Sequence, residues 1–221
     1  MWNIIAVNKI ITWETYVATV ILGFIAYLIG SILFAKVLLW MKGDKEPLYS
    51  YGATAASTRY GAKGFAFVFI GDLLKAVLAF GILWPIYLNV PFFGQASFFV
   101  ALSFVVLGHA LPIFNRFSGG KGISTAFGFA LVLNWFIAIF AIAVYGLWTW
   151  RLKGKYAGVG TSLSVVFYLT IFLFIPFFPE SLVPLKESLE FGSLMAMTGI
   201  TILTIIMNFS AYRNLFNKKT R

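Results

Sequence analysis

The chain has 221 residues, of which 61% are hydrophobic and only 11% are charged, and this balance excludes an ordinary water-soluble globular protein. It has no cysteine and one histidine, which excludes disulfides, thiolate chemistry and His-rich metal clusters; we expect neither a metal nor a cofactor. The formal net charge of +10 fits membrane topology and anionic lipid rather than nucleic-acid binding. We therefore expect a polytopic all-α membrane protein that forms a single domain over 1–221, with the lipid bilayer as a partner.

Apolar runs predict the membrane spans in chain order. A helix needs about 20 residues to cross a bilayer. Runs of this kind cover roughly 17–40, 65–88, 94–114, 161–178 and 193–210. The segment 124–150 is long for one helix and short for two full spans, so we expect a short hairpin that bends near Asn134-Trp135.

The distribution of basic residues predicts the orientation. Thirteen of the 17 lysines and arginines fall in four segments, 42–63, 115–123, 151–156 and the tail from residue 213. The positive-inside rule places these segments in the cytoplasm. The chain is then expected to have about seven membrane helices, with the N-terminus outside and the C-terminus cytoplasmic.

Several polar residues fall inside the predicted spans. Asp72 and Lys75 are three residues apart and share a helix face, which favours an internal ion pair over direct chemistry. Gly30, next to Ser31, indicates a close helix contact. His109 is either a hydrogen-bonded interior group or, because it precedes a glycine-rich loop by ten residues, a catalytic or orienting group.

That loop, Gly119-Gly120-Lys121-Gly122, is the most informative motif of the chain. Glycines let backbone N–H groups approach an anion, and the following helix N-terminus adds partial positive charge. Lys121 adds a full charge. The motif therefore predicts a phosphate-binding pocket at the membrane surface, with a flexible turn and a solvated lysine as the alternative.

Two further loops on the same predicted side have a similar character. The segment from Ser50 to Gly61 is dense in hydroxyls and small residues, and its Arg59 can bind a phosphate with two parallel hydrogen bonds. The segment from Lys155 to Ser164 again brings glycines and hydroxyls to a helix start. Together the three loops indicate a cytoplasmic pocket for phosphorylated ligands that opens toward lipid.

These motifs, in this order, resemble one known family. The stretches that carry the resemblance span nearly the whole chain: Gly30-Ser31-Ile32, Gly52-Ala53-Thr54 with Arg59, Asp72-Leu73-Leu74-Lys75, Gly108-His109 with Pro112-Ile113-Phe114 and Phe117-Ser118-Gly119-Gly120-Lys121-Gly122, Lys155-Tyr156 before 161–164, and Arg213-Asn214. The chain is similar to the bacterial acyl-phosphate:glycerol-3-phosphate acyltransferases of the PlsY type. The resemblance implies a seven-helix enzyme of the bacterial plasma (inner) membrane, with its active site on the cytoplasmic side. Such an enzyme transfers a fatty acyl group from acyl phosphate to position 1 of glycerol 3-phosphate, giving lysophosphatidic acid and phosphate.

The resemblance also implies a site. Ser50, Arg59, Lys121 and a hydroxyl of Thr161 or Ser162 would hold the phosphate of glycerol 3-phosphate. The substrate's own phosphate would take the hydroxyl proton, with His109 as a less favoured general base. The expected catalytic residues are Lys121, Arg59 and His109, and the expected substrate-binding residues are Ser50, Gly52, Thr54, Gly119, Gly120, Gly122, Thr161, Ser162 and Asn214. An upstream enzyme that forms acyl phosphate is an expected partner.

The chain also departs from the family pattern. The first loop lacks two asparagines that the family usually carries, Gly158 stands for a serine of the third motif, and Ala211 stands for a histidine in the tail. These departures leave a catalytically inactive family member as one alternative. A transporter for organic phosphates, built on the same cationic pocket, is the other.

Overall fold

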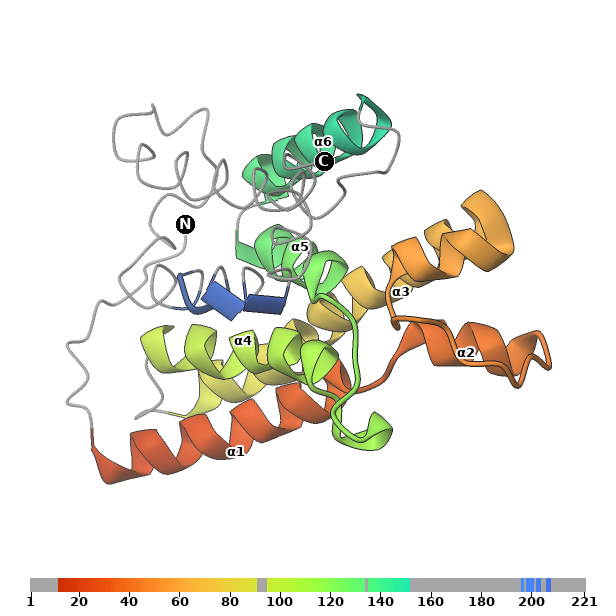
Figure 1. The fold of residues 1–221 in the computed structure, drawn as a ribbon. Coiled ribbons are helices and arrows are strands. Elements are labelled where there is room, and N and C mark those ends of the chain that lie inside the picture. Colours follow the sequence, from red (N-terminus) through yellow and green to blue (C-terminus); the bar gives the residue numbers. More distant parts are fainter. Residues whose placement is uncertain are drawn as a thin grey trace, which may run out of the picture.

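The structure is a computed structural model that describes residues 12–90, 95–133 and 135–151, together with eight helical residues between 196 and 207. Throughout this part of the chain the regular secondary structure is helical. The helices are α1 (Trp13–Gly30), α2 (Phe34–Met41), α3 (Ala53–Asn89), α4 (Gln95–Ala110), the 3-10 turn η1 (Ile113–Asn115), α5 (Ile123–Leu133) and α6 (Trp135–Arg151). In Figure 1, α4 lies beside α1, α5 follows α4, and α3 passes behind both α4 and α5.

Backbone contact between α1 and α4 holds the first part of the bundle together. A Cβ atom built on Gly30 would lie 2.1 Å from the carbonyl oxygen of Val105, and one on Gly108 would lie 2.1 Å from that of Tyr27. Only glycine lets the two helix backbones approach this closely, as is common between membrane helices. The close helix contact predicted at Gly30 is therefore confirmed.

Glycines also set the contacts of α3. A Cβ on Gly128 of α5 would lie 2.1 Å from the carbonyl oxygen of Leu73, so α3 and α5 are again in backbone contact. Gly71 of α3 faces the ring of Phe34 in α2, where a Cβ would come within 2.2 Å of the ring. Because α3 touches α1, α2, α4 and α5, it is the element around which the others are placed.

The first predicted span, 17–40, is two helices rather than one. Helix α1 ends at Gly30, Leu33 is extended with φ −96° and ψ 109°, and α2 begins at Phe34. The predicted span is confirmed as a segment long and apolar enough to cross a membrane, and the break within it is stabilised by another helix. The Lys75 ammonium of α3 donates hydrogen bonds to the carbonyls of Gly30 and Ile32, at 2.8 and 2.9 Å.

Helix α3 begins earlier than the predicted span 65–88. Residues from Ala53 onward are helical, so part of the segment 42–63 that we expected to be a loop is the first section of α3. Gly61 interrupts this helix with φ 64° and ψ −156°, a backbone conformation that favours glycine. A helix of 37 residues would rise about 55 Å, more than a bilayer's hydrocarbon core, and the kink separates its first section from the rest.

Two helices in contact with each other, α5 and α6, flank the position where the hairpin bend is predicted. Helix α5 ends at Leu133 and α6 begins at Trp135, and Asn134 lies outside the described residues. With 11 residues, α5 rises only about 16 Å, too little to cross a bilayer alone. The expected span 94–114 corresponds to α4 and η1, and the last expected span, 193–210, is helical at each of its described residues. The expected span 161–178 lies outside the described residues.

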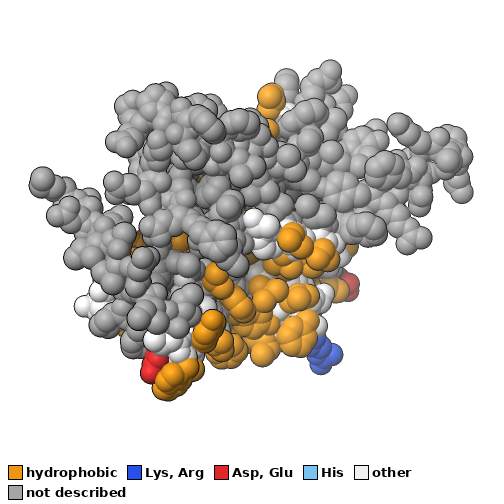
Figure 2. All heavy atoms as spheres, turned by 90° about the vertical axis from the view of Figure 1, so that its left-hand side faces the viewer, with side chains coloured by type: hydrophobic (Ala, Val, Ile, Leu, Met, Phe, Trp, Pro, Cys, Tyr) orange, Lys and Arg blue, Asp and Glu red, His pale blue; other side chains and the backbone are white. Residues whose placement is uncertain are grey.

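Apolar side chains cover the outside of the described helices as well as their interior. Three helical segments are long and apolar enough to cross a membrane, 13–41, 53–89 and 97–115. On α1, Trp13, Val20 and Phe24 are each more than half exposed. Figure 2 shows such apolar side chains gathered on one face of the molecule, with charged side chains at its margins. This outward apolar surface is what a lipid solvent requires, so the chain is an integral membrane protein.

The contact between α1 and α4 can be tested with a single methyl group. Replacing Gly30 with alanine (Gly30→Ala) should destabilise the protein by about 1–3 kcal/mol, because the new Cβ collides with the backbone of Val105. The matched control is Gly81→Ala in α3, where nothing lies within 4 Å of the added Cβ, so the melting temperature should be kept or slightly raised. Thermal unfolding in detergent measures both. Equal melting temperatures for the two variants would contradict the contact.

Candidate functional site

The glycine loop, residues 119–122, connects η1 to the start of α5. Gly122 has φ +77°, which favours glycine, and its carbonyl accepts the backbone N–H of Ala126 at 2.8 Å in the first turn of α5. Lys121 stands directly before this helix start, and its partial burial lowers the pKa of its ammonium. The loop therefore places one cationic side chain beside the unpaired backbone N–H groups and the positive end of a helix.

The same loop rests on the end of α4. The backbone N–H of Gly120 donates to the carbonyl of His109 at 3.2 Å. A Cβ on Gly119 would lie 2.2 Å from that carbonyl oxygen, and a Cβ on Gly120 would lie 2.2 Å from Nε2 of the His109 ring. Gly119 and Gly120 are therefore needed so that the loop can pack against His109. The sequence predicted these glycines for a different reason, the approach of their N–H groups to an anion.

The start of α3 also adjoins the glycine loop. The carbonyl oxygen of Tyr51 would lie 2.9 Å from a Cβ on Gly120, and the next residue, Gly52, is the N-cap of α3. Thr54 in the first turn is exposed. The starts of α3 and α5 therefore meet at one loop, and two helix N-termini with one lysine make this region suited to an anion.

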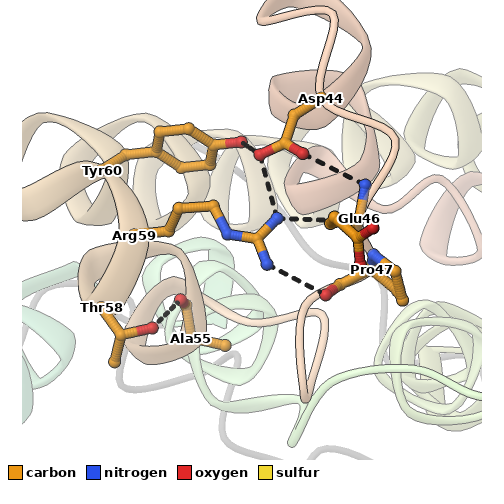
Figure 3. A network of polar contacts seen from close by, with 7 residues as sticks. All are labelled: Asp44, Glu46, Pro47, Ala55, Thr58, Arg59 and Tyr60. Atoms are coloured by element: carbon orange, nitrogen blue, oxygen red, sulfur yellow. Dashed lines mark hydrogen bonds and ion pairs between the residues drawn. The ribbon is translucent and has the colours of Figure 1, made fainter.

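Arg59 of α3 is held on the loop that precedes this helix (Figure 3). Its guanidinium donates to the Asp44 carboxylate at 2.9 Å and to the carbonyls of Glu46 and Pro47 at 2.7 and 3.2 Å. The Tyr60 hydroxyl donates to the same carboxylate at 2.6 Å, and this bond is the largest of the causes that hold the pKa of Asp44 below its ordinary value. Three of the five guanidinium N–H groups are thus directed at residues 44–47 and not at the glycine loop.

A second polar cluster lies in the interior, next to the glycine loop. The Lys75 ammonium contacts Asp72 Oδ1 at 3.1 Å and His109 Nδ1 at 2.8 Å, and Asp72 Oδ1 is 3.4 Å from His109 Nδ1. The three side chains are at most 2% exposed. The predicted internal ion pair between Asp72 and Lys75 is confirmed, and His109 is its third member.

The structure brings together one part of the predicted site. Gly119 and Gly120, next to Lys121 and Gly122, lie against His109, and Gly120 also meets Tyr51, which stands between Ser50 and Gly52 and precedes Thr54. The guanidinium of Arg59 lies instead among residues 44–47. Thr161, Ser162 and Asn214 lie outside the described residues, so their expected contacts with the substrates stay predictions.

Sequence reasoning missed two residues of this region, Asp44 and Tyr60. Asp44 is one of only seven acidic residues in the chain, and it stands in an otherwise basic segment, which was an available signal for an arginine partner. Tyr60 gave no such signal. It is an aromatic residue in an aromatic-rich membrane protein, and only the structure shows its hydrogen bond to Asp44.

The fold and the site define an all-helical integral membrane protein with a glycine loop held between helix ends. The sequence profile of the family described as glycerol-3-phosphate acyltransferase matches residues 20–218. A protein of that name from Ralstonia nicotianae is 35% identical over 163 residues, which cover 70% of this chain and 75% of the relative. Another from Pseudomonas entomophila is 31% identical over 208 residues, which cover 90% and 97%.

A solved structure leads to the same family. The crystal structure of PlsY (YgiH), an integral membrane glycerol 3-phosphate acyltransferase, in its glycerol 3-phosphate form is 25% identical in sequence and superimposes with a TM-score of 0.72, covering 91% of this chain and 93% of that one. A second structure of PlsY, the lysophosphatidic acid form, gives the same TM-score. The chain belongs to the glycerol-3-phosphate acyltransferase family.

The seating of the glycine loop on α4 predicts the effect of a methyl group there. Gly120→Ala should destabilise the protein by about 1–3 kcal/mol, because the Cβ meets the His109 ring and the Tyr51 carbonyl. Gly52→Ser is the matched control, since a Cβ at the N-cap of α3 meets nothing within 4 Å and serine is a favoured N-cap. Thermal unfolding in detergent should show a lower melting temperature for the first variant alone; the reverse order would refute the seating.

Proposed function

We propose that the protein transfers a fatty acyl group from acyl phosphate to the sn-1 hydroxyl of glycerol 3-phosphate, giving lysophosphatidic acid and inorganic phosphate. The observation that carries this proposal is Lys121 in a glycine loop between the starts of α3 and α5, in a chain of this family. The related PlsY structures bear the names of a substrate and a product of this reaction.

The chemistry needs little more than such an anion site. The sn-1 hydroxyl oxygen attacks the acyl carbonyl carbon, a carbon–oxygen bond forms, and the bond from that carbon to the phosphate oxygen breaks. The phosphate leaves with the bonding electrons, and the hydroxyl proton passes to a phosphate oxygen of the substrate. Because acyl phosphate is a mixed anhydride with a good leaving group, no covalent nucleophile is needed. The protein must position two anions and offset their repulsion.

The proposed roles follow from the positions of the side chains. Lys121 and the free backbone N–H groups at the helix starts bind the phosphate of glycerol 3-phosphate, with Ser50 and Thr54 at the start of α3 as hydroxyl partners. Arg59 joins when the phosphate replaces Asp44 as the partner of its guanidinium. In this proposal Thr161 or Ser162 binds the same phosphate, and Asn214 in the tail also contacts the substrates.

We also propose the membrane arrangement that the basic residues predict. The protein is a single domain of seven membrane helices in the bacterial plasma membrane, with its N-terminus outside and its C-terminus and active site on the cytoplasmic side. Contacts between two of the basic segments support this arrangement. Lys36, near the first basic segment, donates to Asn115 at 2.9 Å, and Tyr51 adjoins Gly120, so both segments lie at one end of the helices. An upstream enzyme supplies the acyl phosphate.

The position of the Asp72–Lys75 pair favours an acyltransferase over a transporter. A path for organic phosphates through the membrane would need these charges to be available to a ligand. Lys75 instead donates to two backbone carbonyls and contacts His109, and Asp72 is fully buried beside it. The remaining alternative, an inactive family member, is decided by assay.

Turnover with palmitoyl phosphate and glycerol 3-phosphate tests the proposal directly. The purified protein should release inorganic phosphate and lysophosphatidic acid in equal amounts. Lys121→Ala should lower kcat/KM by about 100-fold or more, because a cation aimed at the reacting anions is removed. Lys63→Ala, which removes an exposed lysine from α3, is the matched control and should keep the activity.

The same assay has outcomes that contradict the proposal. Folded wild-type protein that binds glycerol 3-phosphate without turnover would leave a binding or transport role. Folded protein that neither binds nor turns over would favour an inactive family member. Near-normal activity of Lys121→Ala would refute the role given to this lysine.

The lowered pKa of Lys121 predicts a pH dependence of substrate binding. Because burial favours the neutral amine, the positive charge is lost at a lower pH than in an ordinary lysine, and affinity for glycerol 3-phosphate should fall as the pH rises through that pKa. Lys121→Arg should bind without this alkaline loss, since arginine keeps its charge. Equilibrium binding of radiolabelled glycerol 3-phosphate measures both proteins, and the same alkaline loss in both would show that another group titrates.

A further inference from the structure

The buried cluster of Asp72, Lys75 and His109 has no part in the reaction as described above, yet it lies against the glycine loop. His109 is the link, because its Nδ1 faces Lys75 while its Nε2 faces Gly120. The protonation of this ring therefore decides what the cluster can do at the loop. A proton on Nδ1 leaves Nε2 as an acceptor, whereas a proton on Nε2 makes that atom a donor.

The hydrogen bonds of Lys75 determine which nitrogen of the His109 ring acts as the acceptor. An ammonium has three N–H groups, and Lys75 Nζ has three hydrogen-bond partners: the carbonyls of Gly30 and Ile32 and the Nδ1 atom of His109, at 2.8, 2.9 and 2.8 Å. Asp72 Oδ1, at 3.1 Å, pairs with this ammonium by charge and accepts no hydrogen bond from it. Two of these partners are carbonyl oxygens, which only accept. With the third N–H directed at Nδ1, this nitrogen accepts, and a neutral ring then carries its proton on Nε2.

The alternative places the proton on the ring and leaves Lys75 as a neutral amine. Both arrangements have the same net charge beside the Asp72 carboxylate. An alkyl ammonium, however, holds its proton about four pK units more tightly than an imidazolium, with reference values of about 10.4 and 6.5. Asp72 Oδ1 is also closer to Lys75 Nζ, at 3.1 Å, than to His109 Nδ1, at 3.4 Å. Both comparisons place the positive charge on Lys75.

We propose that Asp72 and Lys75 are positioning residues that hold His109 as a neutral imidazole with its proton on Nε2. His109 then presents an N–H group to the glycine loop, where its Nε2 lies against Gly120. A ring held in this form has no free basic nitrogen, since Nδ1 is engaged by Lys75. His109 therefore fixes the loop that carries Lys121 and does not act as the general base; this kinetic part of the inference rests on the proposed function.

Nitrogen NMR reads the protonation state of the ring without any assay of activity. The chain has a single histidine, so full-length protein labelled with ¹⁵N-histidine, with any affinity tag removed, gives signals from His109 alone. We expect one unprotonated nitrogen, assigned to Nδ1 by its couplings to the ring protons, and a protonated Nε2 between about pH 6 and 8, around the reference pKa of histidine. A protonated Nδ1, or an imidazolium over this range, would overturn the inference.

A charge-neutral double variant tests the part played by the pair. Lys75→Met alone would leave a buried unpaired carboxylate, so Asp72→Asn is combined with it. In the double variant His109 should show a mixture of tautomers or titrate, because the N–H directed at Nδ1 is gone. An unchanged Nε2–H tautomer in this variant would overturn the role of the pair, and the wild-type spectrum decides the tautomer even if the variant does not fold.

Kinetics of two His109 variants separate a positioning role from general-base catalysis. His109→Ala should raise KM for glycerol 3-phosphate about tenfold or more, with a smaller effect on kcat, because the loop loses its support. His109→Gln, which offers an N–H donor and cannot act as a base, should recover most of that loss. A fall of kcat by about 100-fold or more in both variants is the expectation for a general base and would overturn the inference.

The proposed function and the positioning role of the cluster are refuted by different results. Absence of turnover in the folded wild-type protein would refute the proposed function while leaving the NMR result in force. Normal turnover together with a protonated Nδ1 would refute the positioning role alone.

Discussion

The rest of the structure depends on one buried ammonium. Lys75 is 3% exposed in the middle of α3, and a charge at such a position must be compensated by a counter-ion and by acceptors for its hydrogens. Asp72 supplies the charge, and the carbonyls of Gly30 and Ile32 supply acceptors. Those carbonyls become available only because α1 ends there. The break in the first membrane segment and the ion pair therefore require each other.

The glycines of α1, α4 and the glycine loop place the candidate site next to this buried ammonium. Gly30 and Gly108 bring α1 and α4 into backbone contact, which places the end of α4 next to Lys75. Gly119 and Gly120 then seat the loop on that end. The lysine of the loop is thereby attached to a packed framework of helices rather than to a mobile turn, and such preorganisation is what transfer between two anions requires.

Sequence reasoning succeeded where the signal was local. A charged pair three residues apart in an apolar helix has few uses other than pairing, so Asp72 and Lys75 were predictable. The division of 124–150 into two helices, α5 and α6, was predictable from segment length and charge. Sequence reasoning failed where a partner distant in sequence decides the outcome. The helical start of α3 at Ala53 follows a segment that looks like a loop, and Arg59 is held by Asp44.

The sequence by itself determined the lipid environment of the chain, the class of fold, the family and the glycine loop with its lysine. Composition, charge and motif order are properties of the chain alone. Tertiary structure decided which groups these residues meet. Burial gives His109 one set of neighbours, a lysine on one ring nitrogen and a glycine against the other, and no spacing in the sequence encodes that arrangement. The physical reason is that the protonation state of a buried polar group depends on the partners within hydrogen-bond reach. For His109 those partners come from three separate segments of the chain.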